Sequence, residues 1–216
     1  MAEVSLLSHS PILPAEPAAE SRGWLVSGRR SSAPLTLTDM SPLAKVAVRA
    51  APVGSMAAAL ATEHGTVSRQ RDAVLTSAVP GEWLALAAPG TQASVVAWME
   101  ELADRSGQFV SVIDLTHARA LVRLTGRQAA HVLAKECALD LTDRGCPDQH
   151  ALRTAVSGLA VDVVRDDRAG TPSYLLHCER SSGQYFFDSL LDAGEEFGID
   201  VDGFHPPPPP RLEESR

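Results

Sequence analysis

The sequence predicts an α+β protein built from two similar halves, each roughly β-α-β-β-α. Short segments alternate polar and apolar residues, as half-buried strands do, and longer ones place apolar residues at helical spacing. The order of these segments repeats on both sides of a seam at residues 113–126. Residues 46–60 correspond to 122–135, and residues 83–102 to 174–195. We therefore expect two sheets with helices on their outer faces.

Residues 1–37 have a different composition, rich in Ala, Ser and Pro and with weak periodicity. They predict a flexible or partner-wrapping N-terminal arm, in which Ile12, Trp24, Leu25 and Val26 would be the anchors on a partner. The folded domain is then expected over residues 38–200, with halves at about 38–115 and 116–200.

The first half carries clear strand and helix signals. Residues 45–49 alternate in polarity, and Pro80-Gly81 is a turn signal between two apolar runs. Val95, Val96, Met99 and Leu102 fall on one face of a helix. Strands are predicted at residues 45–49, 72–76, 82–87 and 109–115, and helices at residues 55–63 and 92–105.

The second half restarts the pattern after the seam. Gly158 separates two alternating runs tightly, and Gly198 follows an apolar stripe at helical spacing, where it would end a helix. Strands are predicted at residues 119–124, 151–157, 159–165 and 174–178, and helices at residues 127–137 and 183–197. Residues 201–216 contain five consecutive prolines and predict a polyproline II tail, either solvated or docked in an aromatic groove.

Composition limits the class of function. The 216 residues are 44% hydrophobic and 21% charged, with a net charge of −8, which disfavours a nucleic-acid partner. Glu3 and His9 interrupt the region where a signal peptide would be apolar, and no run of 18 apolar residues could span a membrane. Three cysteines at unremarkable spacing fit a reducing compartment. We expect a cytoplasmic protein.

The usual catalytic motifs are absent from the sequence: the glycine patterns of dinucleotide and triphosphate sites and the Gly-x-Ser-x-Gly nucleophile motif. Zinc would need four converging ligands. The set His131, Cys137, Cys146 and His150 spans a helix and a loop, so ordinary packing is the favoured interpretation. Asp114 and His117 could form an acid–base pair, but a turn-capping role is favoured because no nucleophile accompanies them.

Arginines gather on the predicted strands of the second half. Either they form a solvated sheet face with scattered ion pairs, or they form a surface for a partner, where a planar guanidinium binds carboxylates well. The residues are Arg119, Arg123, Arg153 and Arg180.

Several sequence stretches resemble one family. They are Asp114-Leu-Thr-His-Ala-Arg119 with Val122-Arg-Leu-Thr-Gly126, Ala130-His-Val-Leu through Cys137-Ala-Leu-Asp-Leu141, the Arg153-Thr154 pair, and Cys178-Glu-Arg-Ser181 with the stretch from Tyr185 to Gly198. Their order and spacing are similar to those of the gamma subunit of heterotetrameric sarcosine oxidase. The resemblance covers residues 37–198 and is densest from Asp114 on.

The resemblance implies a fold like the folate-binding domain of the glycine-cleavage aminomethyltransferase, shortened and without a cofactor of its own. The assembly oxidises the N-methyl group of sarcosine to give glycine, hydrogen peroxide, and formaldehyde or methylene-tetrahydrofolate. FAD, FMN, NAD and tetrahydrofolate would lie on the alpha and beta subunits and zinc on delta. This chain would hold no catalytic, cofactor or metal residue.

The partners implied are the alpha, beta and delta subunits, and Arg119, Arg123 and Arg180 are the expected contact residues. The alternative is a free-standing tetrahydrofolate-binding or one-carbon transfer protein of the aminomethyltransferase superfamily. Asp114 is then the candidate for the folate-binding carboxylate. A third interpretation is a scaffold unrelated to oxidation.

Overall fold

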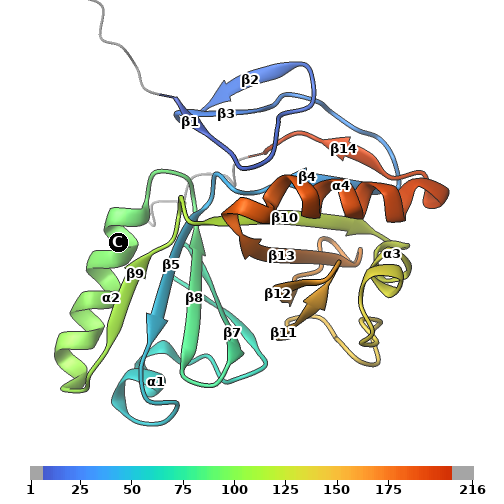
Figure 1. Ribbon diagram of the computed structural model, residues 1–216. Coiled ribbons are helices and arrows are strands. Elements are labelled where there is room, and N and C mark those ends of the chain that lie inside the picture. Colours follow the sequence, from blue (N-terminus) through green and yellow to red (C-terminus); the bar gives the residue numbers. More distant parts are fainter. Residues whose placement is uncertain (1–6, 206–216) are drawn as a thin grey trace, which may run out of the picture.

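The computed structural model describes residues 7–205. Two sheets pack against each other, helices cover their outer faces, and a small three-stranded sheet lies across one end (Figure 1). The proline run of the predicted tail lies outside the described residues. No helix in residues 7–205 has the length and apolar character needed to cross a membrane.

The first sheet has five antiparallel strands in the order β6-β7-β8-β5-β9. Helices α1 and α2 cover its outer face (Figure 1). The strands are β5 (Ala44–Arg49), β6 (Val67–Gln70), β7 (Ala73–Val79), β8 (Glu82–Ala87) and β9 (Ser111–Asp114), and the helices are α1 (Ser55–Leu60) and α2 (Gln92–Ser106).

The second sheet has six strands in the order β11-β12-β13-β10-β4-β14, all antiparallel except β14 beside β4. Helices α3 and α4 cover its outer face. The elements are β4 (Leu35–Asp39), β10 (Arg119–Gly126), α3 (Ala129–Glu136), β11 (Ala151–Val156), β12 (Leu159–Arg165), β13 (Ser173–Glu179), η1 (Arg180–Ser182), α4 (Gly183–Gly194), η2 (Glu195–Phe197) and β14 (Asp200–Asp202).

The predicted repeat is present, with more strands than expected. Each half runs β-α-β-β-β-α-β, from β5 to β9 and from β10 to β14. Strands β6 and β14 were not predicted, because four-residue and three-residue segments carry too little alternation to be read. The last predicted helix ends in the 3₁₀ turn η2, and Gly198 follows with a φ of 69°.

The N-terminal segment differs from the predicted flexible arm. Strands β1 (Ser8–His9), β2 (Ala18–Ser21) and β3 (Trp24–Ser27) form the small sheet, and β4 enters the second sheet beside β10. Three of the four expected anchors, Ile12, Trp24 and Val26, are buried in this chain itself, and Leu25 is half-buried. The expected division near residue 38 cuts through β4.

Gly126 permits the pairing of β4 with β10. Its φ is 147°, and a side-chain carbon there would collide with the carbonyl oxygen of Pro34. A larger residue would push β4 away from the seam strand. The close approach of two backbones therefore explains why glycine follows Thr125 at the end of the seam.

An apolar layer joins the two sheets. It is distinct from the two outer cores beneath the helices. Its members come from the inner faces of both sheets, from the N-terminal segment, from the connection between β4 and β5, and from the residues after β14: Trp24, Val26, Met40, Leu43, Val67, Leu84, Leu86, Leu121, Ala151, Val164, Leu175 and Phe204.

Lys45 lies on the inner side of β5 and is fully buried. Its Nζ donates to the carbonyl oxygens of Ser41 (2.7 Å) and Leu43 (2.8 Å). Burial lowers the pKa of Lys45 to about 7, while the charges of Asp39 and Asp114 oppose the shift. A neutral amine has two N–H groups, so Lys45 can still make both hydrogen bonds after it loses its proton.

Substituting Lys45→Met should change how stability depends on pH. In the unfolded chain Lys45 keeps its proton at pH values where the folded chain has lost it, so wild-type stability rises with pH above about 7. This adds a slope of up to about 1.4 kcal/mol per pH unit, and the variant lacks it. Urea unfolding at about pH 7, 8 and 9 measures both slopes, and equal slopes would contradict the prediction.

Candidate functional site

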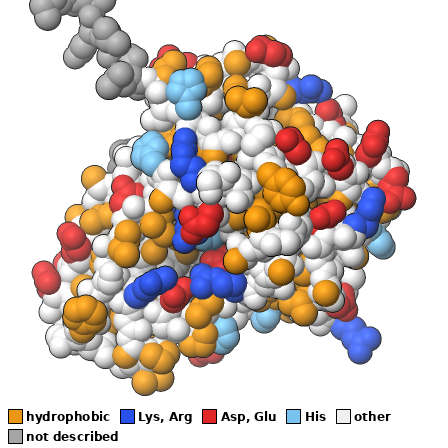
Figure 2. Space-filling view, viewed as in Figure 1, with side chains coloured by type: hydrophobic (Ala, Val, Ile, Leu, Met, Phe, Trp, Pro, Cys, Tyr) orange, Lys and Arg blue, Asp and Glu red, His pale blue; other side chains and the backbone are white. Residues whose placement is uncertain are grey.

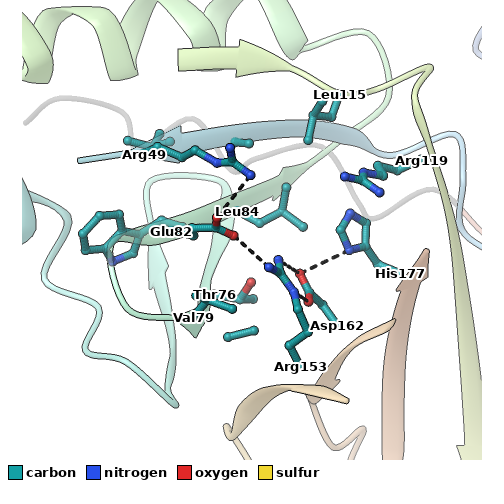
Figure 3. Close-up of a pocket in the computed structure, with 14 residues that line it drawn as sticks. Arg49, Thr76, Val79, Glu82, Leu84, Leu115, Arg119, Arg153, Asp162 and His177 are labelled. Atoms are coloured by element: carbon teal, nitrogen blue, oxygen red, sulfur yellow. Dashed lines mark hydrogen bonds and ion pairs between the residues drawn. The ribbon is translucent and has the colours of Figure 1, made fainter. Parts of the chain in front are cut away.

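A chain of charged side chains links the inner faces of the two sheets (Figure 3). From the first sheet, Arg49 pairs with Glu82 at 3.1 Å. From the second, Arg153 reaches Glu82 at 3.0 Å and binds Asp162 through Nε (2.5 Å) and Nη2 (3.1 Å). We call Arg49, Glu82, Arg153, Asp162 and His177 the inter-sheet polar chain.

The positions of these residues follow from strand register. Arg153, Asp162 and His177 lie directly opposite one another on β11, β12 and β13, so their side chains share one face. That face is the inner one, because Leu121 continues the same row on β10 and belongs to the apolar layer. The row meets Glu82 of β8 across the gap between the sheets.

Burial and pairing set the protonation states of Asp162 and His177 in the inter-sheet polar chain. Burial acts to raise the pKa of Asp162, but contacts with His177 and Arg153 outweigh it and bring the pKa to about 2. Burial lowers the pKa of His177, so the imidazole is neutral at pH 7. Its Nδ1 lies 3.4 Å from Asp162 Oδ2 without the geometry of a hydrogen bond, which leaves Arg153 as the principal partner of Asp162.

The cavity beside the inter-sheet polar chain is small, about 50 Å³. At roughly 30 Å³ per water it holds one or two water molecules. Its charges also balance: Arg49 and Arg153 pair with Glu82 and Asp162, and Arg119 pairs with Glu179. This arrangement can hold two sheets together, and it has neither the space nor the free charge to bind a cofactor.

A second ionic cluster lies at another junction of the sheets. Arg69 of β6 and Arg123 of β10 both bind the carboxylate of Asp166, which is 2% exposed. Arg123 Nη2 donates to Asp166 Oδ2 at 2.8 Å, and its Nη1 donates to Ser173 Oγ at 2.7 Å. Arg168 adds a third guanidinium at 3.4 Å from Asp166 Oδ2.

The three arginines expected at a partner surface are not brought together. Arg123 is 8% exposed and holds Asp166, so it is not available on the surface of this chain. Arg119 also faces inward, pairs with Glu179 and lines the small cavity. Arg180 is half-buried, and its guanidinium donates to the carbonyl oxygen of His9 at 2.8 Å, which ties the N-terminal segment to the seam. A contact role for Arg180 stays a prediction.

The predicted acid–base pair and the predicted metal ligands do not form sites either. The Oδ1 of Asp114 accepts the backbone N–H of Thr116 at 2.8 Å, while His117 stacks on Trp24 with ring centroids 4.8 Å apart. They form a turn and a packing contact instead of an acid–base pair. Cys137 and Cys146 are buried in the core under α3 and α4. Residues 7–205 contain no group of three or more His, Cys, Asp and Glu side chains that could hold a metal ion.

Sequence reasoning missed Glu82, Asp162, His177 and Asp166 as members of the ionic clusters. A usable signal existed for Asp162. It is a carboxylate inside the apolar run Val161-Asp-Val-Val164, and an ionised group in a buried strand requires a partner. That partner is Arg153, which the sequence placed on a neighbouring predicted strand without pairing it with Asp162.

Comparison with known proteins identifies the family. Residues 35–215 match the family described as the GCVT N-terminal domain. The sarcosine oxidase gamma subunit of Corynebacterium sp. (strain P-1) is 31% identical over 172 residues, which cover 74% of this chain and 80% of that subunit. The chain belongs to the sarcosine oxidase gamma-subunit family. The resemblance predicted from the seam motif is thereby confirmed.

Solved structures agree with this family in fold. A chain of the heterotetrameric sarcosine oxidase from Corynebacterium sp. U-96, in complex with pyrrole 2-carboxylate, superposes with a TM-score of 0.65 at 22% identity, covering 84% of this chain and 89% of that one. Aminomethyltransferase T of the Bartonella henselae glycine cleavage system gives 0.62 at 19% identity, covering 86% and 55%. The predicted aminomethyltransferase-like α+β fold is confirmed.

Some relatives are much longer than this gamma-family chain. Human mitochondrial dimethylglycine dehydrogenase is 29% identical over 136 residues, which are 63% of this chain and 16% of the dehydrogenase. The chain therefore spans about one sixth of the length of that relative.

The described residues do not fit tetrahydrofolate between the sheets. The two cavities there measure about 50 and 170 Å³, whereas ligand pockets usually measure ≈ 300–1,000 Å³. Asp114, the candidate folate carboxylate, is the exposed last residue of β9 and lines neither cavity.

Substituting Arg153→Gln should destabilise the protein by roughly 1–3 kcal/mol, because Asp162 would stay buried without its bidentate partner and the sheets would lose their ionic link. The matched control is Arg105→Gln on α2, an exposed arginine whose change should stay within about 0.5 kcal/mol. Chemical denaturation measures both. Equal effects for the two variants would show that the inter-sheet polar chain does not stabilise the fold.

Proposed function

We propose that this chain is a structural gamma subunit of a flavin-dependent oxidase of N-methylated amino acids such as sarcosine, and that it carries no catalytic residue itself. The match to a gamma subunit over 80% of that subunit's length carries the proposal. The fold shared with a chain of a heterotetrameric sarcosine oxidase supports it.

The proposed reaction needs redox cofactors, which other subunits would have to supply. Oxidising an N-methyl amine removes two electrons and two protons, which requires a redox cofactor. We propose that FAD, FMN, NAD and tetrahydrofolate bind to the alpha and beta subunits and zinc to delta. The balanced, water-sized cavity beside the inter-sheet polar chain is consistent with a supporting role for this chain.

The longer relative suggests that subunit contacts of this chain replace contacts that are intramolecular in that relative. In dimethylglycine dehydrogenase the matching stretch is part of a much longer polypeptide. There, contacts between this stretch and the rest of the protein are intramolecular. In a separate gamma subunit, the corresponding surface would have to contact other subunits.

One surface has the exposed apolar character that a subunit contact requires. Phe109 is 94% exposed, Val53 76% and Ile113 43%, and Ile113 lies on β9, the edge strand of the first sheet. Figure 2 shows apolar side chains gathered at the lower left, where Figure 1 places α1 and the end of α2. Exposed aromatic residues are frequent anchors of protein interfaces. We propose that Val53, Phe109 and Ile113 contact a larger subunit.

Capture of the tagged chain from its native cells tests the assignment. We expect two large chains and one small chain to co-purify and the eluate to show the visible absorption of a flavin. Sarcosine should then be oxidised with release of hydrogen peroxide. A colourless, solitary chain that binds tetrahydrofolate would favour the free-standing folate-binding alternative and overturn the proposal.

Substituting Phe109→Asp should lower the yield of the assembled complex by about tenfold or more, because a charge would replace an apolar anchor. The residue is exposed, so the fold of the chain should be unchanged by circular dichroism. Leu139→Asp, at an exposed leucine of the second half, is the control and should assemble normally. Normal assembly of the Phe109 variant would remove this surface from the proposed interface.

A further inference from the structure

A groove lies at the border of the first sheet, between the start of α2 and the adjoining ends of β7 and β8. Its volume is about 330 Å³, within the range of ordinary ligand pockets. Its walls are mainly apolar and include Ala73, Ala87, Ala88, Val95 and Trp98. We call it the Trp98 groove.

Trp98 and Arg71 give the Trp98 groove an aromatic wall with a cationic rim. The guanidinium of Arg71, an exposed residue of the turn between β6 and β7, lies 4.8 Å from the centroid of the Trp98 ring. Among residues 7–205, no carboxylate forms an ion pair with Arg71. The groove therefore suits an apolar segment followed by a negative charge.

The described part of the chain ends beside this groove. His205, its last residue, lines the cavity of about 170 Å³ between the sheets. Asp72, Ala87 and Ala88 line both that cavity and the Trp98 groove, so the two are direct neighbours. Phe204 is 4% exposed and belongs to the apolar layer. The residues that follow His205 therefore start from a fixed point next to the groove.

The sequence after His205 has the length and chemistry to enter the groove. Residues 206–210, which lie outside the described residues, are all proline. In a polyproline II helix five prolines span about 15 Å. Thr91 and Trp98, which both line the groove, are about 10 Å apart along the axis of α2, given the rise per residue of a helix. The proline run is long enough to extend along the groove.

We propose that the proline run of this chain docks in the Trp98 groove of the same chain. Polyproline II segments bind grooves lined by aromatic rings, because they are rigid before binding and lose little conformational entropy. The pyrrolidine rings would pack on Trp98 and Val95. Glu213 and Glu214 follow the prolines and supply carboxylates for Arg71.

The point of attachment favours this chain's own segment over a proline-rich segment of another protein. Because the run begins directly after His205, its docking is intramolecular. A short linker gives an effective concentration in the millimolar range, which a separate protein would have to exceed. The docked segment would keep an apolar groove covered whether or not the chain has partners.

Fluorine NMR of the full-length chain labelled with 5-fluorotryptophan tests whether the proline run covers Trp98. Substituting Pro207→Ser, Pro208→Ser and Pro209→Ser together keeps the length and the charge but removes the rigid run. We expect the Trp98 resonance to shift and to respond more strongly to exchange of H₂O for D₂O.

Two controls accompany this measurement. Trp83 is buried in the core beneath α1 and α2 and does not line the groove, so its resonance should stay unchanged in the triple variant. Pro52→Ser, at an exposed proline before α1, should change neither resonance. An unchanged Trp98 resonance in the triple variant would overturn the proposal.

Backbone ¹⁵N relaxation then locates the docking site. Arg211 carries the first amide N–H after the prolines, and we expect its order parameter to exceed about 0.6, the value below which a backbone is flexible. Ser94→Arg places a long side chain in the groove from an exposed position of α2, and should lower that order parameter below about 0.6. Ala97→Arg is the matched control, because Ala97 is exposed on the same helix but does not line the groove.

A flexible Arg211 in the unsubstituted chain, or equal values in the two α2 variants, would contradict the assignment of the groove. If Trp98 were protected only in a complex while Arg211 stayed flexible, a partner would cover the groove and the proposal would be wrong. These outcomes are independent of whether the chain joins an oxidase.

Discussion

The structure depends on one packing constraint: each sheet has helices on only one face, so the two remaining faces must bury each other. The apolar layer between the sheets satisfies this constraint with leucines and valines from both halves. Charged side chains on the same faces are then forced to find partners inside the molecule. The inter-sheet polar chain and the arginines around Asp166 are the result, and both stand where one sheet meets the other.

The strands and helices of the two halves could be predicted because their alternation is strong, as in β5, β8 and β12. Alternation cannot show whether a given face of a strand packs against water or against another sheet. Arg119 and Arg123 fall on one side of β10, and a sequence does not tell whether that side faces water or a second sheet. Leu121 between them was the available hint, since an apolar residue in that row indicates burial.

The remaining differences come from interactions over long separations in sequence. Composition favoured a flexible arm over residues 1–37, yet Leu35–Asp39 forms β4 because β10 supplies its hydrogen bonds and Gly126 gives it room. The candidate site was hidden for the same reason. Arg49, Glu82, Arg153, Asp162 and His177 come from five strands, and only strand register and sheet packing bring them together. No short motif contains more than one of them.

The position of β4 constrains how the chain can acquire its fold. Thr36 pairs with Asp200 across almost the whole length of the chain, and Leu37 pairs with Leu124 at the seam. Strand β4 is therefore synthesised before either of its partners, β10 and β14. Such non-local pairing slows folding and leaves a strand edge open in the meantime. The nascent chain must keep β4 from pairing with other chains until β10 and β14 have left the ribosome.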